Sequence, residues 1–478
     1  MKRYPLVEEI HIQFKAPQCF ELLKGRPFSF FLDSGMDPAK LGRYSFMGSD
    51  PFLVLKSRGQ EVSLIHSNGQ QRIIKGNPFD VAGQLLELYS LDASPAGVPF
   101  VGGAVGYFSY DLCHFIERLP KTAVDDLNLP ECYLAFYDTI LTFDHLEGKT
   151  YLVATGFPEL EEGKRRRQAQ ERLKEMKNRI LINPLPSIME EAATRESIVL
   201  KLNFTREQYL KAVETAREYI LAGDIFQVNL SQRFEVDLSV TPYGLYQQLR
   251  RINPAPFASY LGFEGVSVVC ASPERFLKVR GDWVQTRPIK GTRPRGKSVA
   301  KDDALARELL SSIKDRAENV MIVDLERNDL GRICRYGTVK VTELAILEPY
   351  PTVFHLTSTV EGRLRPGKNR IDLLKATFPG GSITGAPKVR AMEIIDELEP
   401  TRRSIYTGSI GYLSFNGEMD LNIVIRTFIV KGGRAYFQVG GGIVYDSEPE
   451  AEYEETLDKA RALIQALNIS TRVTVEAR

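Results

Sequence analysis

Residues 410–415 read Ile-Gly-Tyr-Leu-Ser-Phe and residues 423–430 read Ile-Val-Ile-Arg-Thr-Phe-Ile-Val, two stretches rich in β-branched and aromatic side chains. Such stretches favour β-strands. Helices are expected among stretches of this kind, at residues 304–323, 388–398 and 451–467. Because strands and helices do not alternate regularly, the pattern predicts an α+β fold with large antiparallel β-sheets packed face to face and helices outside.

The chain divides into three regions by composition. Residues 1–158 contain short strand-like runs broken by turn pairs such as Asn-Gly, which indicates a sheet-rich region. Residues 159–200 begin highly charged and continue into proline-containing sequence, as expected for a solvated helix followed by a linker. Residues 201–470 open with a capping-box pattern, in which Thr205 precedes Gln208. We expect both halves to form one compact body.

Composition argues against several classes of protein. The 478 residues are 43% hydrophobic and 26% charged with a formal net charge of +1, so we expect no nucleic-acid surface and no electrostatic attachment to membranes. The N-terminus lacks an apolar signal-peptide core, and no run approaches the ~20 apolar residues of a membrane span. The five cysteines are scattered without C-x-x-C spacing, which argues against structural zinc and a disulfide framework. A cytoplasmic protein is expected.

A lysine and a glutamate form the first candidate site. Lys290 lies in Pro288-Ile289-Lys290-Gly291-Thr292, and Glu274 lies in Ala271-Ser272-Pro273-Glu274-Arg275. An amine can act as a nucleophile, and a carboxylic acid beside it can protonate a leaving group. The plainer interpretation is a surface ion pair, which contributes less than ~1 kcal/mol. The remaining motifs favour the first interpretation.

Carboxylates at a helical spacing of three form a second candidate site. Asp315 and Glu318 share one face of the first expected helix, and Glu452 and Glu455 share one face of the last. Acidic residues in the first turn of a helix often only complement its dipole. The alternative is a Mg²⁺ site, because this ion prefers oxygen ligands and retains several waters.

Two glycine-rich stretches are candidates for binding an anion. Residues 379–388 read Pro-Gly-Gly-Ser-Ile-Thr-Gly-Ala-Pro-Lys, and residues 439–443 read Val-Gly-Gly-Gly-Ile. The first stretch lacks the Gly-Lys-Ser/Thr ending of an ATP-binding phosphate loop. A glycine loop that leads into a helix still offers backbone amides to an anion, and a carboxylate serves as well as a phosphate.

Together these motifs resemble those of the chorismate-utilising enzymes. The resemblance spans residues 204–467 in family order and extends upstream to residues 102–107. The motifs that carry it are Gly223-Asp224-Ile225-Phe226-Gln227-Val228-Asn229, residues 271–276, Asp324-Leu325-Glu326-Arg327-Asn328-Asp329, residues 379–388, Tyr406-Thr407-Gly408, Arg426-Thr427 and residues 452–459. The resemblance implies the fold of that family and an enzyme that acts on chorismate.

Lys290 distinguishes between members of this family. Anthranilate synthase large subunits have alanine at this position, whereas a Pro-Ile-Lys-Gly-Thr motif, like residues 253–257, resembles aminodeoxychorismate synthase component I. Isochorismate and salicylate synthases have a water-activating lysine where this chain has Gln227, and an amide is no general base near neutral pH. The expected activity is therefore conversion of chorismate and ammonia to 4-amino-4-deoxychorismate, for para-aminobenzoate and folate synthesis.

The resemblance also implies roles for individual residues. Lys290 forms a covalent intermediate while Glu274 protonates the departing C4 hydroxyl. The Mg²⁺ ligands are Glu318 and Glu455, with Asp315 and Glu452 reaching metal-bound waters. The substrate-binding residues are Thr292, Ser382, Tyr406, Arg426, Gly440, Gly442 and Lys459. His355 occupies a family active-site position, but a lone histidine in an apolar strand is more often structural, so both interpretations stay open.

The implied partner is a separate glutamine amidotransferase subunit, because nothing in this chain resembles a glutaminase that would supply ammonia. In the first region, Leu32-Asp33-Ser34 resembles the tryptophan-pocket motif of the family but departs from its usual Leu-Glu-Ser, so Leu32 and Ser34 are candidate effector contacts. Two other hypotheses are anthranilate synthase component I and a noncatalytic regulatory homologue. Lys290 argues against the first, and the retained acidic residues argue against the second.

Overall fold

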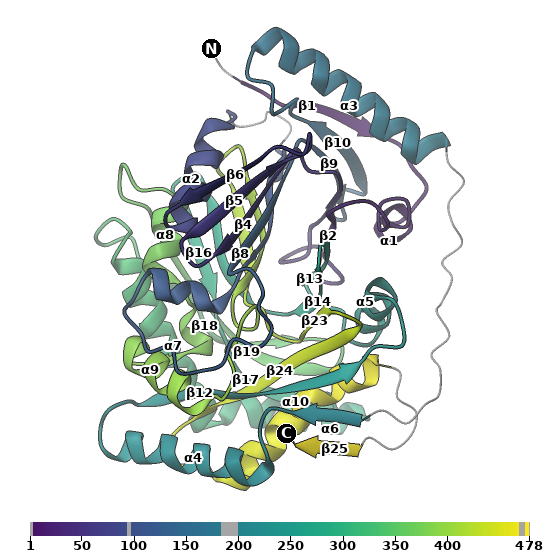
Figure 1. Ribbon diagram of the computed structural model, residues 1–478. Coiled ribbons are helices and arrows are strands. Elements are labelled where there is room, and N and C mark those ends of the chain that lie inside the picture. Colours follow the sequence, from purple (N-terminus) through teal and green to yellow (C-terminus); the bar gives the residue numbers. More distant parts are fainter. Residues whose placement is uncertain (1–2, 93–96, 183–198, 468–473, 478) are drawn as a thin grey trace.

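The computed structural model describes residues 3–92, 97–182, 199–467 and 474–477. Two large β-sheets form its centre, and helices lie around them (Figure 1). Every strand pair described is antiparallel except β11 with β25, which run parallel.

Within these ranges the first sheet contains thirteen strands. In spatial order they are β1 (Leu6–Ile10), β10 (Lys149–Ala154), β9 (Thr139–Asp144), β3 (Tyr44–Gly48), β2 (Ser29–Asp33), β13 (Phe257–Phe263), β14 (Val266–Ser272), β23 (Thr427–Lys431), β24 (Arg434–Ile443), β12 (Gln227–Asp237), β11 (Val199–Leu202) and β25 (Thr474–Ala477), with β20 (Gly385–Ala386) paired to β12.

The second sheet contains twelve strands over the same described ranges. Their order is β17 (Ile289–Pro294), β19 (Val353–Arg363), β16 (Trp283–Arg287), β15 (Arg275–Arg280), β22 (Met419–Asn422), β21 (Ser409–Ser414), β7 (Gly103–Phe108), β8 (Cys132–Tyr137), β4 (Leu53–Arg58), β5 (Glu61–His66) and β6 (Gln71–Lys75), with β18 (Lys340–Pro349) paired to β19.

The helices lie on the outside of the sheets (Figure 1). They are α1 (Ala16–Phe20), α2 (Pro78–Leu88), α3 (Glu162–Ile182), α4 (Arg206–Leu221), α5 (Pro242–Ile252), α6 (Val299–Ser311), α7 (Ile313–Gly331), α8 (Arg370–Thr377), α9 (Lys388–Leu398) and α10 (Pro449–Ala466), with 3-10 turns η1 (Tyr110–Phe115) and η2 (Gly381–Ile383). At one end of the molecule α3 contacts β9 and β10, and at the other α10 contacts α4 and β24.

The two sheets pack face to face through aromatic side chains. The ring centroids of Phe30 on β2 and Tyr137 on β8 lie 4.5 Å apart, and those of Phe46 on β3 and Tyr412 on β21 lie 5.3 Å apart. All four side chains are buried. Because β2 and β3 belong to the first sheet and β8 and β21 to the second, these contacts join the two layers. The predicted α+β fold with antiparallel sheets packed face to face is confirmed.

Both halves of the sequence contribute strands to both sheets. In the first sheet β2 pairs with β13, and in the second β7 pairs with β21. A boundary near residue 200 therefore separates stretches of sequence whose backbones hydrogen-bond to each other. Most of the linker expected before that boundary, residues 183–198, lies outside the described residues.

Two of the predicted elements begin as the sequence indicated. The capping box of α4 is present: the Thr205 hydroxyl accepts from the Gln208 backbone N–H at 3.1 Å, and the Gln208 side chain accepts from the Thr205 N–H at 2.8 Å. Helix α9 occupies the predicted residues 388–398. The capping box is a strong local start signal, which explains why sequence alone locates the start of α4, whereas α9 begins after Pro387 without a side-chain cap.

Two other expectations were wrong in detail. The helix expected at residues 304–323 is divided into α6 and α7, because Ser312 is extended and its hydroxyl caps α7 by accepting from the Asp315 N–H at 3.2 Å. The strand expected at residues 423–430 begins only at Thr427, since Arg426 has a positive φ of 50° that breaks the extended backbone.

The described part of the chain has no helix that is long and apolar enough to cross a membrane.

The close pairing of β7 with β8 requires a glycine at position 106. A Cβ added to Gly106 on β7 would lie 1.9 Å from the carbonyl oxygen of Tyr133 on the neighbouring β8. We predict that Gly106→Ala destabilises the protein by about 3 kcal/mol or more, because backbone at a close approach cannot yield as a side chain can. Gly25→Ala is the matched control, since its Cβ would meet nothing within 4 Å.

The measurement is thermal unfolding of the two variants beside the unchanged protein. Equal melting temperatures for Gly106→Ala and Gly25→Ala would show that the β7–β8 junction is looser than the structure indicates.

Candidate active site

Strands β17 and β19 and helix α7 bring the main predicted residues together. Lys290 and Thr292 lie on β17, His355 lies opposite Thr292 on β19, and Glu318 lies on α7, which packs against both strands. Glu274 immediately precedes β15 in the same sheet. The predicted nucleophile and acid, the predicted substrate contact Thr292 and the candidate His355 therefore lie on adjacent elements.

Glu274 is a buried carboxyl group with two hydrogen-bond donors on one of its oxygens. Its side chain is 4% exposed, and Oε1 accepts from the Ser382 hydroxyl at 2.5 Å and from the Ile289 N–H at 3.4 Å. Burial raises the pKa of Glu274 to about 7, although Ser382 and the positive charges of Lys290 and Arg426 oppose the shift. A carboxyl group with this pKa holds a proton near neutral pH and can donate it.

Lys290 contacts Glu318 and not Glu274. The Lys290 Nζ lies 3.0 Å from Glu318 Oε1, and the amide of Gln227 on β12 donates to the same oxygen. The pKa of Glu318 is lowered, because Lys290 and Gln227 together outweigh the opposing effect of burial. The sequence predicted a Lys290–Glu274 pair; the structure places Lys290 against a predicted metal ligand and leaves Glu274 close enough only to sense its charge.

His355 links a predicted substrate contact to a predicted carboxylate-binding arginine. Its Nε2 lies 3.3 Å from Arg426 Nη2, and its Nδ1 lies 2.8 Å from the Thr292 hydroxyl. A guanidinium can only donate, so Nε2 accepts and Nδ1 carries the hydrogen donated to Thr292. Burial and the Arg426 charge lower the pKa of His355 well below its usual value, so the ring is neutral. The hydroxyl hydrogen of Thr292 is then left for another acceptor.

Three carboxylates approach the glycines of β24. A Cβ added to Gly442 would lie 2.7 Å from Glu318 Oε1, and one added to Gly441 would lie 3.2 Å from Glu452 Oε2 and 3.6 Å from Glu455 Oε1. Glycine therefore leaves the space into which α7 and α10 direct these acids. Hard carboxylate oxygens around such a space fit the ligand preference of Mg²⁺.

Two of these three carboxylates form ion pairs with lysine side chains. Lys290 pairs with Glu318, and Lys459 Nζ lies 2.6 Å from Glu455 Oε1 and 2.9 Å from the Gly440 carbonyl oxygen. Among the described residues, no group of three or more His, Cys, Asp or Glu side chains has a metal-coordinating arrangement. Glu452 is buried and accepts from the Ser447 hydroxyl at 2.6 Å, and burial raises its pKa.

Asp315 belongs to a different set of contacts. Its Oδ2 accepts from Arg293 Nη2 at 3.0 Å, and its backbone N–H is the one that Ser312 caps. Asp315 lies beside Gly291, where an added Cβ would meet Oδ1 at 3.1 Å. The structure thus places Asp315, which was predicted to reach metal-bound waters, beside Gly291 on β17 and in contact with Arg293.

Tyr406, a predicted substrate contact, is 6% exposed. The guanidinium carbon of Arg403 lies over the Tyr406 ring, 5.9 Å from the ring centroid. Burial raises the pKa of its phenol.

Arg403 and Glu326 were missed by the sequence analysis although both contact the turn that carries Ser382. Glu326 lies in Asp324-Leu325-Glu326-Arg327-Asn328-Asp329, one of the motifs that carry the family resemblance, and that position was the signal that could have identified it. Arg403 had none, since Arg402-Arg403 looks like an exposed charged pair.

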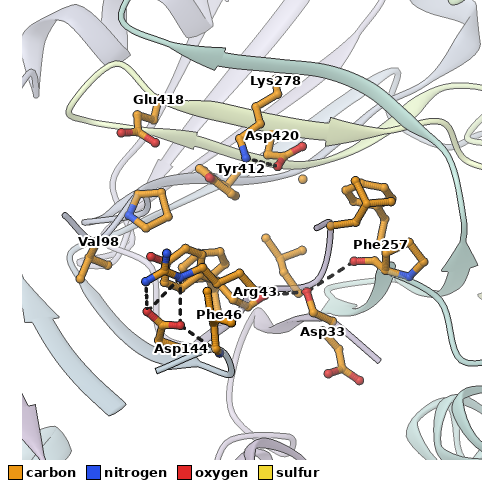
Figure 2. Close-up of a pocket in the computed structure, with 18 of the residues that line it drawn as sticks. Asp33, Arg43, Phe46, Val98, Asp144, Phe257, Lys278, Tyr412, Glu418 and Asp420 are labelled. Carbon is orange, nitrogen blue, oxygen red and sulfur yellow. Dashed lines mark hydrogen bonds and ion pairs between the residues drawn. The ribbon is translucent and has the colours of Figure 1, made fainter. Parts of the chain in front are cut away.

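The predicted effector residues line a separate cavity of about 610 Å³ between the sheets. Figure 2 shows Lys278, Asp420 and Glu418 on one wall and Arg43 with Asp144 on the opposite wall. Leu32 and Ser34 contribute to the lining. The Asp33 carboxylate, which points away from Tyr412 in Figure 2, accepts from the Tyr246 hydroxyl at 2.9 Å and from Arg250. None of the predicted catalytic residues appears in this lining.

Comparison with known proteins identifies the family. Residues 43–465 match the model of the chorismate binding enzymes. The chain belongs to the chorismate-binding enzyme family. It is 40% identical to aminodeoxychorismate synthase component 1 of Bacillus subtilis over 475 residues, which cover 99% of this chain and 98% of that protein.

Other relatives in this chorismate-binding family have a different name. The chain is 41% identical to anthranilate synthase component 1 of Acetivibrio thermocellus over 468 residues, covering 97% of this chain and 95% of that protein. The crystal structure of anthranilate synthase component I from Streptococcus pneumoniae aligns with a TM-score of 0.77 at 36% identity, covering 90% of this chain and 93% of that chain. Membership establishes a chorismate-binding enzyme, and the relatives divide between two activities.

The raised pKa of Glu274 has a consequence for stability. The Glu274 carboxyl group has a pKa of about 7 in the folded protein and a reference pKa of 4.5. Between these two pH values it binds more protons in the folded state than in the unfolded state. Its burial therefore destabilises the protein increasingly as the pH rises through this range. We predict that Glu274→Gln removes this penalty and stabilises the protein by about 3 kcal/mol more at pH 8 than at pH 4.

Chemical unfolding of both proteins at several pH values between 4 and 8 measures this difference. Stability curves that run parallel across that range would mean that Glu274 is ionised in the folded protein at neutral pH.

Proposed function

We propose that this chain is aminodeoxychorismate synthase component I, which converts chorismate and ammonia to 4-amino-4-deoxychorismate for para-aminobenzoate and folate synthesis. The observation that carries the proposal is the position of Lys290, whose Nζ lies 3.0 Å from Glu318 in a cluster that also holds the buried acid Glu274. A primary amine at this place supplies a nucleophile for covalent catalysis. The similarity to the Bacillus subtilis protein of that name also supports it.

Glu318 and Glu455 would hold Mg²⁺, with Glu452 as a neighbouring acid, and the fit rests on the side-chain-free space at Gly441 and Gly442. The bound ion would polarise the ring carboxylate of chorismate as a Lewis acid. For this arrangement Glu318 must give up its ion pair with Lys290 and bind the metal ion instead, which frees the Lys290 amine.

The reaction then proceeds in two substitutions. The Lys290 amine, once it has lost its proton, forms a bond to C2 of chorismate. The electron pair of C1=C2 moves to C1–C6, that of C5=C6 moves to C4–C5, and the C4 hydroxyl leaves as water with the proton of Glu274. Ammonia next forms a bond to C4, the two double bonds return to their original places, and the C2–Nζ bond breaks. Two easier steps replace one difficult substitution.

Glu274 is arranged to deliver its proton from one oxygen. Ser382 and the Ile289 N–H both donate to Oε1, so Oε2 is the atom left to carry the acidic hydrogen. The raised pKa of about 7 means that a large share of the Glu274 side chains carry that hydrogen near neutral pH.

Arg426 and Thr292 would bind the carboxylates and the ether oxygen of the substrate, with His355 orienting both. Because the neutral His355 ring contacts Arg426 through one nitrogen and Thr292 through the other, a shift of either partner disturbs the second. Lys459, Tyr406 and the backbone of Gly440 and Gly442 would complete the anion contacts. His355 orients both partners in this scheme, and no step requires a proton from it.

The second substrate is ammonia, which a separate glutamine amidotransferase subunit would supply in the cytoplasm. Purified alone, the chain should use ammonium and not glutamine. The effector role of Leu32 and Ser34 is a further part of the proposal, supported by the 610 Å³ cavity that both residues line.

Anthranilate synthase component I is the second candidate, favoured by the similarity to the Acetivibrio thermocellus and Streptococcus pneumoniae proteins. It would add ammonia at C2 and release pyruvate. A lysine bound to C2 would block that position, which is why Lys290 weighs against this activity.

The function test is the product formed from chorismate, Mg²⁺ and ammonium. We predict 4-amino-4-deoxychorismate and a covalent adduct on Lys290 when ammonia is withheld, detected by mass spectrometry. Lys290→Ala should abolish the adduct and slow product formation by a factor of about 100 or more, as expected when a nucleophile is removed. Lys301→Ala, an exposed lysine on α6, is the control and should keep the adduct.

Formation of fluorescent anthranilate by the unchanged protein would reject the proposed function in favour of the second candidate. Normal turnover by Lys290→Ala would remove the nucleophile role.

A separate prediction concerns the carboxylates near Gly442. Glu318→Gln and Glu455→Gln should each weaken Mg²⁺ binding, measured by calorimetry, and lower turnover by more than about 100-fold, because loss of one ligand charge removes several kcal/mol of stabilisation. Glu454→Gln, one residue away on α10 and exposed, is the matched control. Unchanged Mg²⁺ affinity in both test variants would place the ion elsewhere.

A further inference from the structure

The turn that carries Ser382 is held by side chains from three different segments of the chain. Glu326 Oε1 on α7 accepts from the Gly381 N–H at 2.9 Å, and Arg403 Nη1 donates to the Ile383 carbonyl oxygen at 2.9 Å. Lys388 Nζ donates to the Pro379 carbonyl oxygen at 2.8 Å. Ser382 lies between the first two contacts, so their geometry fixes the position of its hydroxyl.

Glu326 is an unusual residue for a purely structural contact. It is 2% exposed, and its second oxygen, Oε2, is buried without a hydrogen-bond partner. Burial raises the pKa of Glu326 to about 7, with Asp329 adding to the shift and Lys388 opposing it. A buried carboxyl group that satisfies only one of its oxygens is costly to the fold, so a role outside stability is indicated.

The contact is also close. A Cβ added to Gly381 would lie 2.7 Å from Leu325 Cδ2 and 3.0 Å from Glu326 Oε1, so the turn packs directly on α7. The next residue along the chain, Ser382, donates to Glu274 at 2.5 Å. Helix α7 therefore reaches Glu274 through two bonded links, the Glu326–Gly381 hydrogen bond and the Ser382–Glu274 hydrogen bond.

We propose that Glu326 is a positioning residue for the reaction: by holding the Gly381 N–H it keeps the Ser382 hydroxyl on Oε1 of Glu274 and so leaves Oε2 to carry the proton that is delivered to the leaving hydroxyl. The inference rests on the proposed role of Glu274 as the acid, and both candidate activities require that role because both expel the C4 hydroxyl. The same α7 also carries Glu318, so one helix positions groups at two points of the site.

The test uses variants that separate the hydrogen bond from the charge. Glu326→Met removes the acceptor and the charge, whereas Glu326→Gln removes the charge and keeps an oxygen for Gly381. Ser382→Ala removes the link to Glu274, and the double variant Glu326→Met with Ser382→Ala shows whether the two act in series. Glu361→Gln, a partly buried carboxylate that accepts from Trp283 and Gln285 on the outer part of β19, is the control.

The first readout is the pH dependence of chorismate consumption, whatever the product. We expect Glu326→Met to lower kcat by about 10- to 100-fold with little change in KM, because a misplaced catalytic group costs rate more than binding. The high-pH limb, where Glu274 loses its proton, should move up by about one unit, since Ser382 no longer stabilises the carboxylate. Ser382→Ala should show the same shift, and the double variant no further one. Glu326→Gln should retain most of the rate.

The second readout needs no activity. Each variant is compared with the same variant that also carries Glu274→Gln. The difference in free energy of unfolding between the two, measured at several pH values, gives the titration of Glu274 in that variant. The charges that face Glu274 are Lys290, Arg426 and Glu326. If Glu326 acted only through its charge, Glu326→Met and Glu326→Gln would both move the midpoint down, the opposite direction to the one proposed.

Opposite shifts distinguish the outcomes. An upward shift in Glu326→Met that Ser382→Ala reproduces supports the positioning role even if the product proves to be anthranilate and the proposed function fails. A downward shift, an unchanged midpoint, or additive losses of rate in the double variant would overturn it. A Glu361→Gln variant that matched Glu326→Met would also overturn it, because the effect would then be a general response to loss of a carboxylate.

Discussion

A buried ion pair between Arg403 and Glu399 joins the segments from which the site is built. Both side chains are 1% exposed, with Arg403 Nη2 lying 2.7 Å from Glu399 Oε1. Arg403 also donates to the carbonyl oxygens of Ile383 and Asn229, and Glu399 accepts from the Ser231 N–H at 2.9 Å. Loss of either partner would leave an unpaired charge in the interior, at a cost of about 3–5 kcal/mol. This ion pair therefore fixes the position of the Ser382 turn relative to β12.

The sequence predicted those features that depend on local pattern or on a recognised motif. The cap of α4 follows from neighbouring residues, and the motif around Lys290 identified that lysine as a candidate site residue. Features that depend on contacts between distant segments were beyond such reasoning. The partner of Lys290 is Glu318, and the partner of Asp315 is Arg293, because the path of β17 past α7 decides which acid meets which base.

The two halves of the site use burial differently. Glu274, Glu326 and His355 lie in the interior, where desolvation moves each pKa toward the neutral form. Glu318 and Glu455 remain ionised beside lysines, on the side where Gly441 and Gly442 leave space. One side of the site thus keeps its acids and its histidine in their neutral forms, and the other side holds negative charge. The proposed reaction, in which the substrate loses a hydroxyl while its carboxylate is neutralised, needs both.

The pairing of β7 with β21 has a consequence for synthesis of the protein. Residues 103–108 pair along one edge with residues 132–137, which follow closely in the sequence, and along the other edge with residues 409–414. At roughly 5–20 residues added per second, the ribosome takes on the order of fifteen seconds to a minute to make the intervening chain. During that interval the β7 edge has unsatisfied backbone groups that other nascent chains can bind. The strand order of the finished enzyme therefore leaves one edge of β7 unpaired until the second half has emerged.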